Sequence, residues 1–364
     1  MVGTFSIQRK EGAVSILSEH VTKVKASEVS TVSARALELE RQGRDIIRLS
    51  AGEPDFPTPD HIKMACVKAL CDNKTKYPPA IGVPELREAI SLKLKRDNDL
   101  DYPPNQTIVS SGGKQVLYNA MTATLNPGDE VILVAPYWMT YVGIVQLSRG
   151  IPVVIPTEQE KGFKLSAEAL EKAITPKTKW LFLNSPGNPS GAVYNAGELR
   201  ALADVLRRHP HVWVLSDDIY VMLVYDGIKF QNLLNVAPDL KDRFLVVNGL
   251  SKAYCMPGWR VGYGAGPEGL IKAMFKVQSQ STSGATHFCQ WAAVTALTGD
   301  HSFIASHNAE YTERRDLVVA MANRIPGLSC RPPQGAFYCF VGCQGYIGRK
   351  TPEGAVISSD EDLV

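Results

Sequence analysis

The sequence has no apolar run approaching the roughly 20 residues that a membrane-spanning helix needs. It also has little net charge, because 39 basic residues stand against 37 acidic ones, giving +2. That balance, with no basic run interleaved with aromatic residues, excludes the electrostatic signature of a nucleic-acid-binding protein. Near the start, Arg9 and Lys10 precede only a short apolar stretch and Glu11 follows directly, unlike a signal peptide or an organellar presequence. We therefore expect a cytoplasmic protein with neither a membrane nor a nucleic acid as its partner.

Cysteine and histidine are too scattered along the chain to predict a metal site. The seven cysteines include no C-x-x-C pair, and nothing around Cys339 and Cys343 completes a zinc site. The seven histidines never lie beside carboxylates at metal-ligand spacing. We expect no bound metal, and thiols that stay free in a reducing compartment.

Three common enzyme motifs are also absent or incomplete. The stretch "GAGPEG" (264–269) has the form G-x-G-x-x-G, but a dinucleotide site needs an acidic residue about 20 positions later. Leu270 to Gly299 contains no Asp or Glu, which argues against that site. The stretch "SGGKQ" (111–115) lacks the spacing and the Ser or Thr of a Walker A loop. The nucleophile elbow G-x-S-x-G of the α/β-hydrolases does not occur.

What the sequence does contain is a series of continuous apolar runs separated by helical patterns. The runs cover residues 107–111, 130–135, 179–184, 211–217 and 243–250. Because runs that are apolar on both faces are typical of buried parallel strands, we predict an α/β fold with a mostly parallel sheet flanked by helices. These elements define a large domain over residues 59–299. The two chain ends, 1–58 and 300–364, are predicted to build a smaller α+β domain that includes a strand at "GAFYCFV" (335–341).

Chemically unusual residues follow four of these predicted strands. Parallel strands end at one edge of a sheet, where ligands bind in α/β folds, so the four groups should meet in one crevice. Taken singly, each residue is more often an ordinary surface or turn residue, but their shared position at strand ends favours a common site. They are Gly112, Gly113 and Lys114 after the first strand, Asn188 after the third, Asp217, Asp218 and Tyr220 after the fourth, and Ser251, Lys252 and Arg260 after the fifth.

This combination of groups suits pyridoxal 5'-phosphate. A lysine amine can hold its aldehyde as a Schiff base, and a carboxylate facing the pyridine nitrogen keeps that nitrogen protonated. Its phosphate fits at a helix N-terminus with cationic support. Lys252, Asp217 and the segment beginning at Gly112 offer these three groups, so the residues predict an enzyme that uses this cofactor.

Seven motifs, in order along the chain, resemble those of the class I (fold-type I) pyridoxal-phosphate-dependent aminotransferases. "SPGNPSG", "DDIY" and "NGLSKAYCMPGWRVGY" are similar to the general motifs of that family. "LSAGEPDFPTP", "TKYPPAIGVPELREAI", "SSGGKQVLYNA" and "APYWMTY" are similar to those of the bacterial aspartate aminotransferase branch, in which aspartate activity sometimes accompanies prephenate activity. The resemblance runs from about Val21 to the last residue.

The resemblance implies roles for five residues around the cofactor ring. Lys252 is the implied Schiff-base lysine, which also moves the proton between the substrate α-carbon and the cofactor. Asp217 is implied to face the pyridine nitrogen. Tyr220 and Asn188 are implied to hydrogen-bond the phenolic oxygen of the ring, and Trp138 to stack on the ring.

The same resemblance implies the phosphate contacts, the substrate contacts and an assembly. The residues implied to hold the phosphate are Gly113, Lys114, Ser251 and Arg260, with Tyr77 reaching it from the neighbouring subunit of a homodimer. The residues implied to contact the substrate are Gly52 through its backbone, Lys25 near the substrate side chain, Trp138 and Asn188.

The implied activity moves an amino group between aspartate, or another dicarboxylic amino acid, and a 2-oxo acid such as 2-oxoglutarate or oxaloacetate by a ping-pong mechanism. Val221 replaces a frequent acid after the "DDIY" tyrosine, at a position without a chemical role. The chain ends at Val364, before an arginine in an "FRIS"-like motif that holds the substrate α-carboxylate in the family. From this we expect a smaller domain cut short and poor transamination by the chain as written. A non-catalytic protein that binds pyridoxal phosphate and a prephenate aminotransferase are the alternatives.

Overall fold

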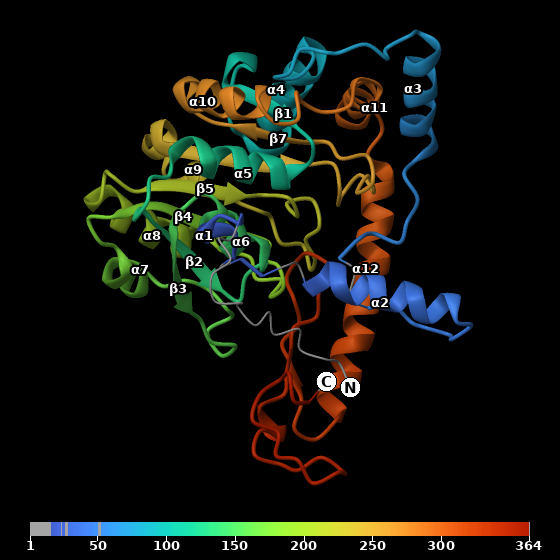
Figure 1. Cartoon of the computed structure of the whole chain (residues 1–364), viewed down its shortest axis with the longest axis vertical. Helices are drawn as coiled ribbons and strands as arrows, with labels where there is room; N and C mark the ends of the chain where they lie inside the picture. Colours follow the sequence, from blue (N-terminus) through green and yellow to red (C-terminus); the bar gives the residue numbers. More distant parts are fainter. Residues whose placement is uncertain (1–15, 23, 26–27, 50–51, 364) are drawn as a thin grey trace.

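The computed structural model describes residues 16–22, 24–25, 28–49 and 52–363, and its centre is a seven-stranded sheet (Figure 1). Neighbouring strands are parallel except around β7, which runs antiparallel to both β1 and β6. The predicted α/β class with a mostly parallel sheet is therefore confirmed. In spatial order the strands are β1 (Thr107–Ser110), β7 (Gly262–Ala265), β6 (Phe244–Gly249), β5 (Trp213–Asp217), β4 (Thr178–Asn184), β2 (Glu130–Ala135) and β3 (Ile151–Pro156).

Helices cover both faces of the sheet because successive strand residues point to opposite sides and both sides are apolar. In β4, Leu181 packs into one core cluster, whereas Trp180 and Phe182 pack into the other. Burying one such side chain stabilises the folded protein by roughly 1.5–3 kcal/mol. The first cluster includes helices α4 (Pro84–Asn98), α8 (Ala196–Arg208) and α11 (His287–Thr298); the second includes α5 (Gly113–Thr124), α6 (Thr140–Leu147) and α10 (Glu268–Ser279).

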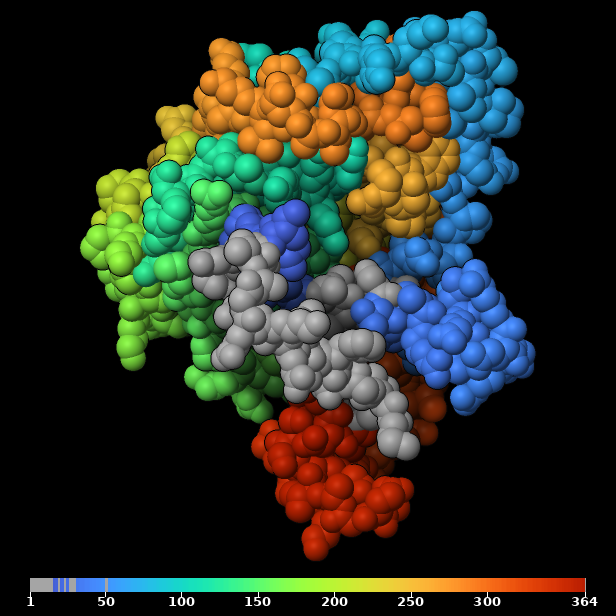
Figure 2. Space-filling model, viewed as in Figure 1, coloured from blue at the N-terminus to red at the C-terminus, as the bar shows by residue number. Residues whose placement is uncertain are grey.

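The remaining elements lie around this body. They are α1 (Glu19–Thr22), α2 (Glu28–Arg41), α3 (Asp60–Cys71), α7 (Ala167–Ala173), α9 (Leu233–Val236), the long α12 (Ser302–Arg324), the antiparallel pair β8 (Ser329–Cys330) and β9 (Val341–Gly342), and the 3-10 turns Pro104–Gln106, Pro238–Arg243 and Gln344–Tyr346. Figure 2 shows the residues after α12 projecting as a lobe at one end of the molecule. The division into domains at residues 58 and 299 stays a prediction.

The predicted strand over residues 335–341 is wrong. Only Val341 belongs to a strand, and the residues before it form an irregular loop. Ala336 has a φ of 58°, which interrupts an extended conformation. The backbone amide of Ala336 donates 2.9 Å to the Leu223 carbonyl, and the Tyr225 hydroxyl donates to the Ala336 carbonyl. Contacts with residues more than 100 positions away therefore decide the conformation of this segment.

Within the described residues, none of the helices is both long and apolar enough to cross a membrane. The same residues contain no group of three or more His, Cys, Asp or Glu side chains that could hold a metal ion.

Candidate active site

A cavity of about 490 Å³ lies at the carboxyl ends of β4, β5 and β6, beside the N-terminus of α5. Most of the residues predicted for the site line this one cavity. They are Gly52, Gly113, Lys114, Trp138, Asn188, Asp217, Tyr220, Ser251, Lys252 and Arg260. The expectation that residues following separate strands meet in one crevice is therefore confirmed.

Three predicted residues lie elsewhere. Asp218 is buried outside the cavity lining, where its carboxylate accepts hydrogen bonds from the Ser216 hydroxyl and the Asn232 side-chain amide. Lys25 is exposed and does not line the cavity. Tyr77 is 95% exposed, which leaves its phenol free to reach another molecule. The predicted contacts of Lys25 with substrate and of Tyr77 with a neighbouring subunit stay predictions.

Lys252 lies in the turn that follows β6, with its amine inside the protein. The Nζ atom donates a hydrogen bond to the carbonyl of Gly52. It also stands 5.7 Å from the ring centroid of Tyr220 and 5.5 Å from that of Phe337. Burial disfavours the charged amine and lowers the pKa of Lys252 to about 8, although the Asp217 carboxylate opposes this effect. A substantial neutral fraction therefore exists near physiological pH, as a nucleophilic lysine requires.

Asp217 is the last residue of β5, is buried and lines the cavity. Its Oδ2 accepts a 2.7 Å hydrogen bond from the Tyr141 hydroxyl, and its Oδ1 accepts a longer one, 3.3 Å, from the Ile219 amide. Burial raises the pKa of Asp217 to about 6, and both donors lower it. The carboxylate is thus ionised at neutral pH while lying in a water-poor place, where it attracts a positive group strongly.

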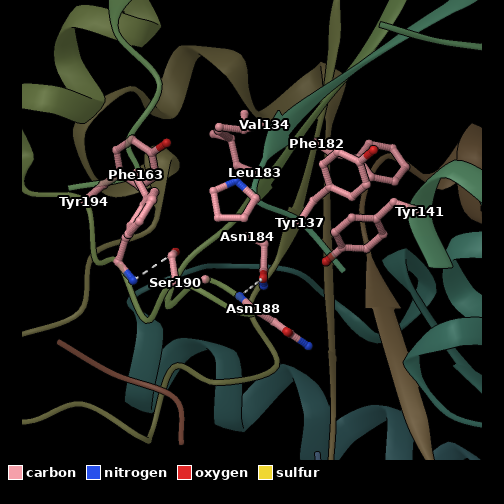
Figure 3. Close-up of a pocket in the computed structure, with 13 residues that line it drawn as sticks. Val134, Tyr137, Tyr141, Phe163, Phe182, Leu183, Asn184, Asn188, Ser190 and Tyr194 are labelled. Atoms are coloured by element: carbon pink, nitrogen blue, oxygen red, sulfur yellow. Dashed lines mark hydrogen bonds between the residues drawn. The ribbon is translucent and has the colours of Figure 1, made fainter. Parts of the chain in front are cut away.

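Asn188 and Tyr220 point their polar ends toward a third side chain, that of Tyr338. The hydroxyls of Tyr220 and Tyr338 are 2.6 Å apart, and the Asn188 amide nitrogen donates to the Tyr338 hydroxyl over 3.4 Å. Asn188 is positioned by its own backbone amide, which donates 2.7 Å to Oδ1 of Asn184 beside a small neighbouring pocket (Figure 3). Burial raises the pKa of Tyr338 to about 12, so this phenol keeps its proton at physiological pH.

The part of the cavity beside the start of α5 is suited to an anion. Gly112, with a φ of 87°, precedes α5, so the first amides of the helix at Gly113 and Lys114 lie at the cavity and have no partner within the helix. A Cβ atom on Gly112 would lie 2.5 Å from Nη2 of Arg260, which shows how closely the guanidinium approaches this turn. Helix amides together with a guanidinium are typical phosphate-binding groups.

Lys114 and Trp138 form a pair on the cavity wall. The Lys114 amine lies 4.8 Å from the centroid of the Trp138 ring, within the range of a cation–π contact. Burial and the nearby Arg260 charge both lower the pKa of Lys114. The indole of Trp138 and the amine of Lys114 therefore lie together at the cavity.

Sequence reasoning missed two residues of the site, Tyr141 and Tyr338. Tyr141 lies in the quoted motif "APYWMTY" (135–141), where only its spacing of three residues from Trp138 could have suggested a shared helical face. Tyr338 was placed in a strand, and no local pattern indicates that its loop reaches the cavity.

A family model for class I and II aminotransferases matches residues 44–360. The chain belongs to this family. This confirms the resemblance drawn from the motifs, and it identifies the chain as an aminotransferase enzyme.

Curated relatives and solved structures that are similar to this chain are also named as aminotransferases. It is 53% identical to a "probable aspartate/prephenate aminotransferase" of Rhizobium leguminosarum bv. phaseoli, over 96% of this chain and 88% of that protein. It is 51% identical to the aspartate/prephenate aminotransferase of Cereibacter sphaeroides, over 96% of this chain and 87% of that protein. The crystal structure of the Rhizobium meliloti aspartate aminotransferase superposes with a TM-score of 0.92 at 49% identity, covering 95% of this chain and 87% of that one.

Proposed function

We propose that this aminotransferase uses pyridoxal phosphate to move an amino group between aspartate, or another dicarboxylic amino acid, and 2-oxoglutarate or oxaloacetate in a ping-pong cycle. The observation that carries the proposal is the single cavity lined by the Lys252 amine, the Asp217 carboxylate and the N-terminus of α5. The names of the relatives, which specify aspartate and prephenate, support the substrate class.

The residues of the cavity fit this cofactor. Among the described residues that line it, Lys114, Lys252 and Arg260 are cationic and Asp217 is the one acid, so the cavity suits a ligand with several negative charges. The glycine at position 112 keeps open a space beside the Arg260 guanidinium that a Cβ atom would fill. The chemistry of the donor set would therefore match a phosphate beside Arg260 and the start of α5, and a protonated pyridine nitrogen beside Asp217.

When bound, the cofactor supplies an aldehyde carbon that takes up the amino group and a ring that accepts the electron pair of the broken Cα–H bond. In our proposal the neutral Lys252 amine would hold the cofactor at that carbon, with loss of the aldehyde oxygen as water. Once the amine of the substrate has displaced it, the freed Nζ would carry the proton to and from the substrate α-carbon. Asp217 holds the proton on the ring nitrogen, Tyr220 and Asn188 donate hydrogen bonds to the ring oxygen, and the Trp138 indole covers one face of the ring.

The phosphate and substrate contacts complete the proposal. Gly113, Lys114, Ser251 and Arg260 hold the phosphate, and the exposed Tyr77 reaches it from the partner subunit of a homodimer. The Gly52 backbone meets the substrate carboxylate, with Lys25 near the substrate side chain. We place the enzyme in the cytoplasm. Prephenate is a second candidate substrate, because the relatives named above include it in their names.

Borohydride reduction tests the cofactor assignment. The purified protein is loaded with pyridoxal phosphate, reduced and digested, and the peptides are mapped by mass spectrometry. The label should lie on Lys252, and a Lys114→Ala variant should keep it there. A label on Lys114, or on no lysine, contradicts the assignment.

A coupled assay tests the reaction itself. The loaded protein should convert aspartate and 2-oxoglutarate to oxaloacetate and glutamate. A second assay, with prephenate as the amino-group acceptor, tests whether prephenate is also a substrate. If reduction labels Lys252 but the loaded, unreduced protein transfers no amino group in either assay, it is a non-catalytic protein that binds the cofactor.

A further inference from the structure

Tyr338 contacts both Tyr220 and Asn188 at the cavity, although it lies outside the residues assigned above to cofactor and substrate. Its ring meets that of Tyr220 edge-on, with centroids 5.7 Å apart and planes at 82°. The two hydroxyls are 2.6 Å apart, and either oxygen can be the donor. The phenol lines the cavity, so this contact lies where a bound ligand would come.

The loop that carries Tyr338 is tied to the two loops that carry its partners. The amides of Gln334 and Gly335 donate 2.9 Å and 3.0 Å to the carbonyl of Gly191, in the loop of Asn188. The amide of Ala336 donates 2.9 Å to the Leu223 carbonyl, in the loop of Tyr220. Tyr338 is therefore held in a fixed relation to both Asn188 and Tyr220.

Hydrogen-bond capacity decides what this contact does. A phenol has one proton to donate and can accept at its oxygen. Tyr220 cannot donate its proton both to Tyr338 and into the cavity. An anionic oxygen in the cavity is a better acceptor than a neutral phenol, so the Tyr220 proton turns to that oxygen. The Tyr338 proton is then free to turn to Tyr220, and each bond in such a chain strengthens the next.

We propose that Tyr338 is a positioning residue that donates a hydrogen bond to the Tyr220 oxygen and thereby directs the Tyr220 proton into the cavity. The inference rests on the proposed function, in which Tyr220 donates to the ring oxygen of bound pyridoxal phosphate. Tyr338 acts through Tyr220, whose oxygen accepts its hydrogen bond.

The pH titration of the absorbance of the loaded protein tests this inference. A hydrogen bond donated to the ring oxygen stabilises its deprotonated state and lowers the pH at which the attached cofactor loses a proton. Tyr338→Phe weakens that bond and should raise the midpoint by about half to one pH unit. Tyr311→Phe is the matched control, because its hydroxyl is buried without a hydrogen bond among the described residues, and its midpoint should equal that of the unaltered protein.

A double variant shows whether Tyr338 acts on the cofactor through Tyr220 or directly. In the Tyr220→Phe background, Tyr338→Phe should cause no further shift of the midpoint. An unchanged midpoint in Tyr338→Phe, or a full shift that persists without the Tyr220 hydroxyl, overturns the proposal; thermal melting confirms that each variant is folded. If the unaltered protein takes up no cofactor at all, the proposed function fails instead, so the two failures are distinguishable.

Discussion

The hydroxyl of Tyr141 donates a 2.7 Å hydrogen bond to Oδ2 of Asp217, so a phenol on α6 supports the carboxylate at the end of β5. Burial and this bond act on the carboxyl in opposite directions, since burial raises the pKa of Asp217 and the donated bond lowers it. The charge of Asp217 at neutral pH therefore depends on a residue that sequence reasoning did not assign to the site.

Tyr141→Phe should raise the pKa of Asp217 in the cofactor-free protein, which the carboxyl bands of its infrared spectrum report as the pH is varied. Without the hydroxyl, the ionised carboxylate loses its shortest donor, so its pKa rises further above about 6. A hydrogen bond to a charged group is worth about 1.5–3 kcal/mol, which corresponds to a shift of about one to two pH units. Tyr137→Phe, at a phenol outside the cavity, is the control, and an unmoved titration midpoint of Asp217 in Tyr141→Phe would disprove the dependence.

Asp217→Asn should stabilise the cofactor-free protein at pH 8 while removing most activity. A carboxyl whose folded pKa is raised contributes stability that is present below its unfolded pKa and lost as the pH rises through its folded value, here about 6. At pH 8 the buried charge costs at most about 3 kcal/mol, and the uncharged amide avoids part of that cost. We expect a melting temperature a few degrees higher at pH 8 and little difference at pH 4.

The activity of the same variant is the second half of that test. Without a carboxylate, the proton on the ring nitrogen has no partner, so the rate should fall by at least about tenfold, or 1.4 kcal/mol of barrier. A variant that is more stable and also fully active would show that another group does this work.

The parts of the structure that could be predicted are those encoded locally. The apolar runs that became β4, β5 and β6 are continuous because both faces are buried, and their ends carry Asp217 and Lys252. Strand β7 was missed since its sequence "GYGA" lacks the expected branched residues. Its glycines allow the start of α5 to pack closely against the strand, because a Cβ atom on Gly262 would lie 2.2 Å from the Gly113 nitrogen.

Tyr338 was unpredictable for a different reason. Its loop is irregular, and the hydrogen bonds that place it come from Gly191 and Leu223, more than 100 residues away in the sequence. Such long-range contacts leave no periodic signal in the sequence around the residue itself.

The rate at which pyridoxal phosphate attaches to the cofactor-free protein should rise with pH up to about 8 and then level off. Only the neutral amine attacks the aldehyde, and burial lowers the pKa of Lys252 to about 8. Below that value the neutral fraction changes about tenfold for each pH unit. Stopped-flow absorbance with excess cofactor gives the rate, and a model lysine compound measured in parallel corrects for the ionisations of the cofactor.

Asp217→Asn should move that break to lower pH, because the Asp217 charge raises the pKa of Lys252. A rate that keeps rising to pH 10 in the unaltered protein would mean that the attacking amine is solvated like a surface lysine.

Arg260→Gln should weaken the binding of pyridoxal phosphate and leave that of pyridoxal, which lacks the phosphate, nearly unchanged. The guanidinium lies beside the turn at Gly112, with Nη2 3.5 Å from the Ser111 carbonyl, so a phosphate at the start of α5 lies within its reach. Loss of one charge-assisted bond of about 1.5–3 kcal/mol raises the Kd about 10- to 150-fold. Fluorescence titration with both compounds measures the difference, and an equal loss for the two would place Arg260 at the ring and not at the phosphate.

Gly52→Ala should disturb the site through Tyr338. A Cβ atom at position 52 would lie 2.4 Å from the Tyr338 hydroxyl and 3.1 Å from two of its ring carbons, so either the phenol or the Gly52 backbone must move. The phenol is held by the Tyr220 hydroxyl at 2.6 Å, and the Gly52 carbonyl accepts the bond from Lys252. We therefore expect a melting temperature lower by a few degrees, consistent with overpacking that costs about 1–3 kcal/mol.

A double-mutant cycle identifies Tyr338 as the cause. In a Tyr338→Phe background the closest atom is gone and only the contacts near 3.1 Å remain, so Gly52→Ala should cost less there than in the unaltered protein, a coupling of at least about 0.5 kcal/mol. Gly269→Ala is the matched control, because a Cβ atom at that position meets nothing within 4 Å, and it should be neutral or slightly stabilising in both backgrounds. Equal costs of Gly52→Ala with and without the Tyr338 hydroxyl would show that the glycine is needed for its backbone and not for the space that the phenol occupies.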